Sequence, residues 1–156
     1  MSSSLFRGLA VVVLGASLGL LPLVAQQGPP PTGAPQENDP HAADELAAER
    51  QALGFVGYLD QGRYADSYAY TGMLIRTQLD RDAFSTQIQK TRAGTGALQA
   101  RELIDAAYTT TLPGAPEGQY VVLHYHVSFA NRQDAVETLT LAFAKGYWRI
   151  VGYYIK

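Results

Sequence analysis

The sequence predicts an α+β domain in which three N-terminal helices pack on a curved four-stranded antiparallel meander sheet. Two observations lead to this fold class. The first half of the folded region has apolar residues at helical spacing, and the second half has alternating apolar and polar residues in runs joined by short turns. Helices followed by sequential strands are typical of a sheet that is covered on one face.

Three stretches have the spacing of amphipathic helices. The first runs from Ala42 to about Leu59, and its apolar stripe is expected to consist of Leu46, Leu53, Val56 and Leu59. The second runs from about Arg63 to Gln78. The third runs from about Asp82 to Arg92 and places Phe84 and Ile88 four residues apart on one side.

Four stretches alternate as half-buried strands do. They run from Leu98 to Thr111, Gln119 to Ala130, Val136 to Ala144, and Tyr147 to Ile155. Lys145-Gly146 is a natural two-residue hairpin turn, because glycine tolerates the positive φ that such turns require. The order of the strands in the sheet is therefore expected to follow the chain.

The register decides which side chains meet on the inner face of the sheet. An odd-numbered loop, such as Asn131 to Gln133, places the apolar residues of the second strand on the same face as Leu139 and Trp148. When the alternation is continued from the last hairpin turn, Glu137 lies opposite Tyr154.

The beginning of the chain is typical of export. Arg7 precedes a long apolar run, and Ala25 offers a small residue for cleavage, so we expect a signal peptide at residues 1–25 that is either cleaved or kept as an anchor. Residues 26–40 are rich in proline and are expected to form a disordered linker. Residues 41–156 are expected to form a single domain, which is periplasmic or secreted and has no membrane span after signal cleavage.

Composition excludes several classes of site and partner. The chain of 156 residues has no cysteine, which excludes disulfides, thiolate metal sites and a cysteine nucleophile. Its formal net charge is −2, without the basic surface that nucleic acid requires. Gly94 and Gly96 lack the strand-before, helix-after setting of a phosphate loop, so no cofactor is expected.

Several segments carry a family resemblance. They are Tyr58-Leu59-Asp60-Gln61-Gly62-Arg63-Tyr64-Ala65, Leu112-Pro113-Gly114-Ala115-Pro116-Glu117-Gly118-Gln119-Tyr120-Val121-Val122, Ser128-Phe129-Ala130-Asn131, Val136-Glu137-Thr138 and Trp148-Arg149-Ile150-Val151-Gly152-Tyr153-Tyr154-Ile155. In their order and spacing they resemble the bacterial family called domain of unknown function 4019. After the third helix, where that family commonly has Arg-x-Pro-Leu-Gly, this chain has Arg92-Ala93-Gly94-Thr95-Gly96. The resemblance implies no established activity; more distantly, the layout is similar to the cystatin-like or nuclear-transport-factor-two-like fold.

Glu137 is the leading candidate for a functional residue, because the register puts its carboxylate on an apolar face near Tyr125. A buried carboxylate is costly unless hydrogen bonds or a charge partner compensate it. In one interpretation Glu137 has a structural role and accepts a bond from a tyrosine, a backbone amide or water. In the other, Glu137, Tyr154, Tyr125 and Trp148 bind a ligand, and Glu137 with Tyr154 are the catalytic candidates. A slip of register would remove both interpretations.

His124 and His126 are two residues apart and therefore lie on one face of a strand. A zinc site needs a third ligand, and the neighbours expected across the ladder, Thr138 and Thr140, are poor zinc ligands. We therefore expect no metal site and assign both histidines to the outer face of the sheet.

That outer face is expected to be too apolar to stay wholly in water. Its residues are expected to be Tyr120, Val122, Val136, Thr138, Thr140, Ala142, Tyr147, Val151, Tyr153 and Ile155. A homodimer formed through this face is the first hypothesis, and cover by the chain's own first helix is the second. A protein partner or simple exposure is the third.

Two functions follow from these patterns. The first is an exported, non-catalytic domain of the cell envelope that dimerises or binds a small ligand or a protein partner. The alternative is a small pocket enzyme that performs proton transfer or hydration with Glu137 as acid or base.

Overall fold

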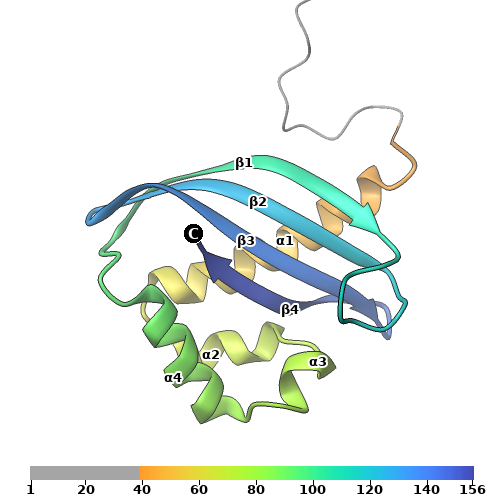
Figure 1. Ribbon diagram of the computed structural model, residues 1–156, viewed down its shortest axis with the longest axis horizontal. Helices are drawn as coiled ribbons and strands as arrows, with labels where there is room; N and C mark the ends of the chain where they lie inside the picture. Colours follow the sequence, from red (N-terminus) through yellow and green to blue (C-terminus); the bar gives the residue numbers. More distant parts are fainter. Residues whose placement is uncertain (1–38) are drawn as a thin grey trace, which may run out of the picture. The chain divides into compact units, whose positions relative to one another are not determined.

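The computed structural model describes residues 39–156, in which helices pack against one face of a four-stranded sheet (Figure 1). The predicted signal peptide lies outside the described residues, as does the predicted linker apart from Asp39 and Pro40. In chain order the elements are α1 (Ala42–Asp60), α2 (Tyr64–Ser67), the 3₁₀ helix η1 (Tyr68–Tyr70), α3 (Met73–Arg76), α4 (Arg81–Arg92), β1 (Leu98–Thr109), β2 (Tyr120–Phe129), β3 (Arg132–Ala144) and β4 (Tyr147–Ile155).

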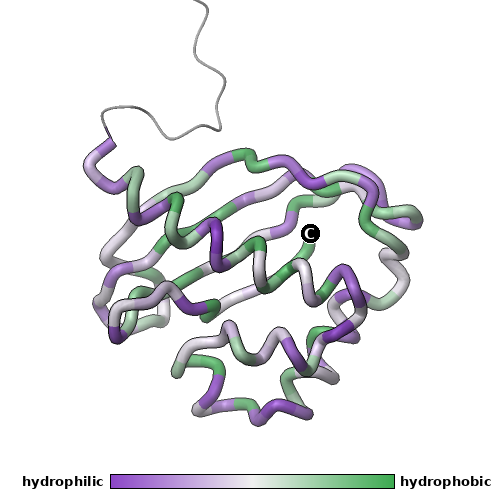
Figure 2. The backbone as a smooth tube through the Cα atoms, turned by 180° about the vertical axis from the view of Figure 1, so that it is seen from behind, coloured by the Kyte–Doolittle hydropathy of each residue, from purple (hydrophilic) through white to green (hydrophobic). Residues whose placement is uncertain are grey.

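The sheet has the meander order β1-β2-β3-β4, and each strand is antiparallel to its neighbour in the sequence. α1 lies across one face of the curved sheet, as the view from behind shows (Figure 2), while α2, α3 and α4 lie beside the edge strand β4 (Figure 1). We call the face toward α1 the inner face and the opposite one the outer face. The predicted fold class is confirmed.

The buried face of α1 differs from the predicted stripe. Leu46 and Leu53 are each 45% exposed, whereas Phe55, Val56 and Leu59 are buried. Alanines complete the buried face, which consists of Glu45, Ala48, Ala52, Phe55, Val56 and Leu59. Alanine at the contact lets the helix backbone approach the sheet closely. The predicted stripe was therefore wrong at Leu46 and Leu53, because it placed the larger leucine side chains at the contact with the sheet.

The second predicted helix is broken into three short pieces. Thr71 has extended backbone geometry and forms an isolated parallel bridge with Ile150 of β4. The backbone N–H of Gly72 donates to the carbonyl of Ile150 over 2.7 Å. Arg76 then holds the turn, because its Nε donates to the Thr71 carbonyl over 3.0 Å. A continuous helix was therefore the wrong prediction, since pairing with the sheet edge competes with it.

The β2–β3 pairing confirms which face each residue takes. Leu123 lies opposite Leu139, and Tyr125 opposite Glu137, all on the inner face. The turn itself is Ala130-Asn131, two residues long, and β3 then carries a bulge near Asp134, whose φ is 59°. A short turn and one extra residue give the same alternation as the predicted three-residue loop, although the partners shift by two positions.

A bulge in β4 corrects the other predicted register. Leu141 pairs with Ile150, but Thr140 pairs with Gly152, so Val151 is an extra residue. The alternation therefore reverses after Ile150. Tyr154, predicted to face Glu137, lies opposite Thr138 and is 52% exposed.

The same reversal turns Tyr153 and Ile155 toward the core, against which both pack. Two members of the predicted outer face therefore belong to the inner face. The extra residue in the strand is the physical reason, because the side-chain period of a strand is two.

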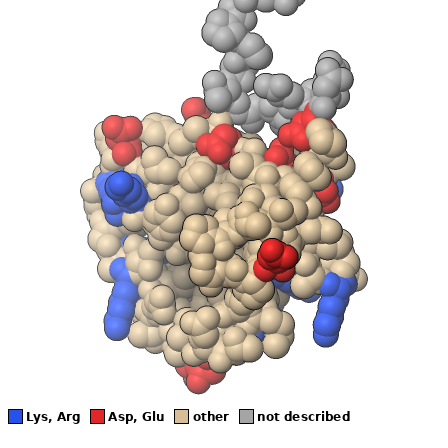
Figure 3. Space-filling model, turned by 45° about the vertical axis from the view of Figure 1, so that its right-hand side comes forward, with Lys and Arg blue, Asp and Glu red and all other residues tan. Residues whose placement is uncertain are grey.

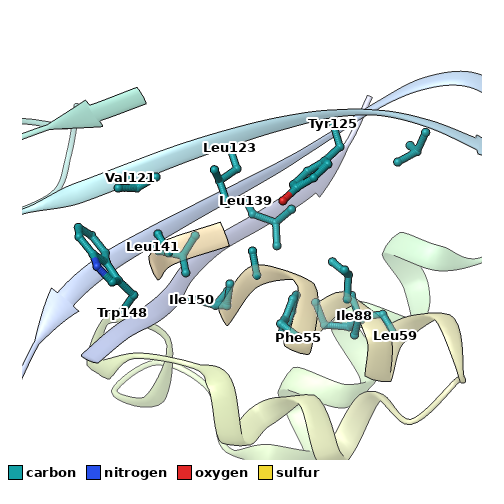
Figure 4. Close-up of a cluster of buried hydrophobic side chains, with 14 of the residues drawn as sticks. Phe55, Leu59, Ile88, Val121, Leu123, Tyr125, Leu139, Leu141, Trp148 and Ile150 are labelled. Carbon is teal, nitrogen blue, oxygen red and sulfur yellow. The ribbon is translucent and has the colours of Figure 1, made fainter. Parts of the chain in front are cut away.

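The hydrophobic core lies between the inner face of the sheet and helices α1 and α4 (Figure 4). Phe55 and Leu59 come from α1, and Ile88 comes from α4. Their partners on the sheet include Val121, Leu123, Tyr125, Leu139, Leu141, Trp148 and Ile150. Trp148 and Tyr125 lie toward opposite ends of this cluster in Figure 4.

We expect Gly72→Ala to destabilise the fold by roughly 1–3 kcal/mol, the usual range for overpacking. A Cβ at Gly72 would lie 3.0 Å from Cγ1 of Val151 and 3.2 Å from Cβ of Arg149. Gly57→Ala in α1 is the control, because nothing lies within 4 Å of its Cβ position and alanine favours a helix by roughly 0.5–1 kcal/mol. Urea unfolding followed by circular dichroism measures both; equal effects would contradict the close contact at β4.

Candidate functional site: a buried cluster of two arginines and two carboxylates

Glu137 is fully buried and surrounded by hydrogen-bond donors. Its Oε2 accepts from Nε of Arg101 over 2.7 Å. Its Oε1 accepts from Oη of Tyr153 over 2.8 Å and from Nη1 of Arg92 over 3.2 Å. The predicted location of this carboxylate on the inner face is confirmed, and it is compensated by two cations and a tyrosine.

Asp60 is the second carboxylate of the same group. Its Oδ1 accepts from Nη2 of Arg92 over 2.6 Å, and its Oδ2 accepts from Nη1 of Arg101 over 2.8 Å. Each arginine thus bridges Asp60 and Glu137. We call Asp60, Arg92, Arg101, Glu137 and Tyr153 the charge cluster; its two formal positive and two formal negative charges cancel.

The members of the charge cluster come from five different elements. Asp60 is the last residue of α1, and Arg92 is the last residue of α4. Arg101, Glu137 and Tyr153 lie on β1, β3 and β4. An acidic residue at a helix C-terminus meets the negative end of the helix dipole, so the two arginines offset an unfavourable interaction of Asp60. The cluster joins the ends of the two long helices to three strands.

The surroundings of Arg101 and Tyr153 raise the pKa of both side chains, so both keep their protons. Burial alone would lower the pKa of Arg101, but hydrogen bonds and charge interactions with Asp60 and Glu137 outweigh it and raise that pKa above its ordinary value. Burial, followed by the negative charge of Glu137, raises the pKa of the Tyr153 hydroxyl. Tyr153 therefore stays protonated and donates to Glu137, which is the arrangement of a structural ion pair rather than of a free general base.

Of the four predicted site residues, Glu137 and Tyr125 lie together, whereas Tyr154 and Trp148 lie elsewhere. Tyr125 is buried opposite Glu137, and its hydroxyl has no hydrogen-bond partner. Burial, and after it the charge of Glu49, raises the pKa of Tyr125. Trp148 packs against Phe143 with ring centroids 5.3 Å apart, at the far end of the core from Tyr125.

The two sheet histidines lie on the outer face and each contacts one carboxylate. Nδ1 of His124 is 3.1 Å from Asp105, and Nε2 of His126 is 2.8 Å from Asp134. Across residues 39–156, no group of three or more His, Asp or Glu side chains is arranged to hold a metal ion.

Arg92, Arg101, Asp60 and Tyr153 were not predicted as site residues. A signal for Arg92 was present, because it continues the buried spacing of Phe84 and Ile88 by a further four residues. The requirement that a buried carboxylate have a cationic partner would have selected it. Tyr153 could not have been identified from the sequence pattern, because only the bulge in β4 turns its side chain toward Glu137.

Two surface grooves lie outside the charge cluster. The β4 groove has a volume of about 540 Å³ and runs between α3, α4, the β1–β2 loop at residues 112–115, and residues 151–153 of β4. None of its lining residues is charged. The hairpin groove has a volume of about 330 Å³ and lies between α3 and the β3–β4 hairpin. Tyr153 is the one residue that belongs to both the charge cluster and the β4 groove.

We expect Glu137→Gln to lower the free energy of unfolding by roughly 3–5 kcal/mol, because it leaves a buried arginine without its counter-charge. The control is Arg63→Ala, which removes an exposed pair with Asp66 and should cost at most about 1 kcal/mol. Denaturant unfolding measures both changes. A gain in stability from Glu137→Gln would contradict the structural role and point to a strained functional carboxylate.

Alkaline pH should destabilise the fold through the two buried tyrosines. The folded pKa values of Tyr125 and Tyr153 lie above their ordinary value of 10.0, so the stability they contribute is complete below pH 10 and is lost as pH rises further. Tyr125→Phe and Tyr153→Phe should each reduce this loss in pH titrations of the unfolding free energy.

The two variants should differ at pH 7. Tyr153→Phe removes a donor to Glu137 and should cost roughly 1–3 kcal/mol, whereas Tyr125→Phe removes only an unpartnered hydroxyl and should be neutral or stabilising. Identical behaviour of the two variants at neutral pH would contradict the assigned hydrogen bonds.

No helix in the described part of the chain is long and apolar enough to cross a membrane.

Comparison with known proteins supports a family and no activity. A comparison with curated proteins finds no match. The family described as "Protein of unknown function (DUF4019)" matches residues 51–153, a span that runs from α1 to β4 and contains the whole charge cluster. This chain belongs to the DUF4019 family.

Proposed function

We propose that this chain is a non-catalytic binding domain, exported to the cell envelope, which holds an extended, uncharged segment of a partner protein in the β4 groove. The observation that carries the proposal is the combination of this groove with the open edge of β4. Helices on one face of a curved meander sheet also support the likeness to cystatin-like and nuclear-transport-factor-two-like folds, which we include in the proposal.

The edge of β4 has backbone groups directed away from the sheet. Val136 and Lys156 exchange two backbone hydrogen bonds, of 3.0 and 2.9 Å. In an antiparallel pair every second residue bonds across in this way, so the N–H and C=O groups of Tyr153 and Ile155 point away from β3. Among residues 39–156, β4 forms one backbone hydrogen bond to a segment outside the sheet, in which the N–H of Gly72 donates to the carbonyl of Ile150.

An edge of this kind favours an extended peptide. Such a peptide adds a strand to the sheet through main-chain hydrogen bonds, and neighbouring pockets select its side chains. The β4 groove adjoins this edge, and its volume of about 540 Å³ is within the usual range for ligand sites. Leu74 and Ile75 from α3 and Phe84 and Ile88 from α4 give it apolar walls.

The lining also indicates what the segment carries. With no charged side chain in the groove, a charged guest would lose its hydration without gaining a counter-ion. Gln78, Gln87 and Thr140 supply neutral polar groups at the groove. A segment of small apolar and hydroxyl side chains fits this chemistry.

The charge cluster supports a binding role over an enzymatic one. Glu137 accepts hydrogen bonds from three donors and lines neither groove, so the alternative of an acid–base enzyme built on it has less support. Through Tyr153, the cluster instead fixes one wall of the β4 groove.

A neutral model peptide, acetyl-(Val-Thr)₃-amide, tests the proposal in amide-resolved NMR titrations. We expect saturable chemical-shift changes of the amide signals, centred on Tyr153 and Ile155. The amides on the exposed side of α1 should not shift. Ile155→Pro removes an edge N–H and should abolish the shifts, while the matched control Ile155→Ala shortens the same side chain, keeps the N–H and should retain them. Shifts that survive Ile155→Pro, or no shifts with the native chain, would overturn it.

A homodimer through the outer face is a second candidate. Figure 3 shows the molecule turned by 45° from the view of Figure 1, and most of the surface in that view has no charged side chain. On the outer face, Val122, Val136 and Ala142 are only half-buried, and the hydroxyl of the buried Thr138 has no hydrogen-bond partner. Val122→Glu should reduce the sedimenting mass by half if the dimer forms; a monomer mass for the unaltered chain would remove this candidate.

A further inference from the structure

We propose that the hairpin groove is a docking surface for a membrane that carries anionic lipids. It lies between α3 and the tip of the β3–β4 hairpin, which share one end of the molecule in Figure 1. Three cationic residues, Arg76, Lys145 and Arg149, line it together with Met73 and Tyr147. The remaining lining residues are Thr71, Gly72 and Ala144, so no carboxylate belongs to it.

The charge of this surface is not neutralised within the chain. In the described residues, none of Arg76, Lys145 and Arg149 forms an ion pair with a carboxylate. Arg76 donates to the carbonyls of Tyr68 and Thr71, and Arg149 donates to that of Ala69. These bonds fix the two guanidinium groups at the surface and leave their positive charge available.

The three cations of the hairpin groove contrast with the charge of the chain as a whole. The whole chain has a formal net charge of −2, and its most buried arginines, Arg92 and Arg101, are already paired. Three unpaired cations around one groove are therefore a local excess of positive charge. Such clusters attract anionic headgroups at a membrane surface.

The apolar residues beside the cations complete the chemistry of an interfacial site. Met73 is 65% exposed and Tyr147 is 62% exposed, the highest values among the large apolar side chains of the described residues. Phe143, on the strand next to Tyr147, is exposed as well. Cations flanking exposed Met, Tyr and Phe allow apolar side chains to enter the headgroup region while the charges meet anionic lipids.

The hairpin tip is built to project these groups. Lys145 and Gly146 form the turn, with φ of 53° and 84°, and the exposed Lys145 lies at the tip of the β3–β4 hairpin. Arg149 lies with its guanidinium carbon 5.4 Å from the ring centre of Tyr147. The cation and the aromatic ring can therefore approach a surface together.

A local probe tests the docking independently of the chain's N-terminus. The chain has no cysteine, so a single introduced cysteine takes one polarity-sensitive fluorophore. Ala144→Cys places it on the hairpin groove, and Ala83→Cys places the control on the exposed side of α4. Vesicles of phosphatidylcholine alone are compared with vesicles that contain phosphatidylglycerol.

We expect the label at residue 144 to shift to apolar emission only with the anionic vesicles, and the shift to reverse in 0.5 M salt, at about which ionic strength surface electrostatics is largely screened. The label at residue 83 should not respond. Lys145→Glu should weaken the response by at least about fivefold, the size expected for loss of one cation near an anionic surface. Lys90→Glu on α4 is the matched control and should leave it unchanged.

Three results would overturn the proposal. Equal responses of the two labels, or equal responses to neutral and anionic vesicles, would show that the hairpin groove is not the contact. A response to the soluble acidic copolymer poly(Glu,Tyr) without one to vesicles would assign the surface to an acidic protein instead. Met73→Ser provides a second variant: retention of the full shift would exclude insertion of the apolar side chains.

Discussion

A neutral and largely buried cluster of two arginines and two carboxylates is the constraint on which the arrangement of helices and sheet depends. Asp60 and Arg92 end the two long helices, and the strands supply Arg101, Glu137 and Tyr153. Removing one charge leaves another buried without compensation, which is far more costly than losing a surface ion pair. The cluster thereby sets where each helix ends relative to the sheet, and it keeps the wall of the β4 groove that contains Tyr153 in place.

The second determining feature is a single extra residue in β4. Because Val151 is bulged, Tyr153 rather than Tyr154 faces Glu137, and the cluster receives its neutral donor. The same bulge lies in the part of β4 that lines the uncharged groove and next to the residue that bonds to Gly72. Bulges are frequent where a sheet edge serves a function, since they redirect a side chain and end regular pairing.

Much of the architecture could be predicted from the sequence, because turn chemistry and alternation agree through β2 and β3 and in β4 as far as Ile150. The burial of Glu137 and its contact with Tyr125 also followed from that pattern. The partners of Glu137 did not, since Arg101 is 36 residues away in the chain and only the folded sheet brings it near. The break at Gly72 and the rotation of α1 depend on backbone contacts and on the small size of alanine, which hydrophobic periodicity does not encode.

The meander order of the sheet has a kinetic consequence. Each strand pairs with the next one along the chain, and such local pairing closes short loops, which favours rapid folding. The contacts of the charge cluster are of another kind, because Arg92 bonds to Glu137 across 45 residues and Arg101 to Asp60 across 41. A sheet assembled through local hairpins would acquire these contacts late, so the cluster governs how slowly the native state opens more than how quickly it forms.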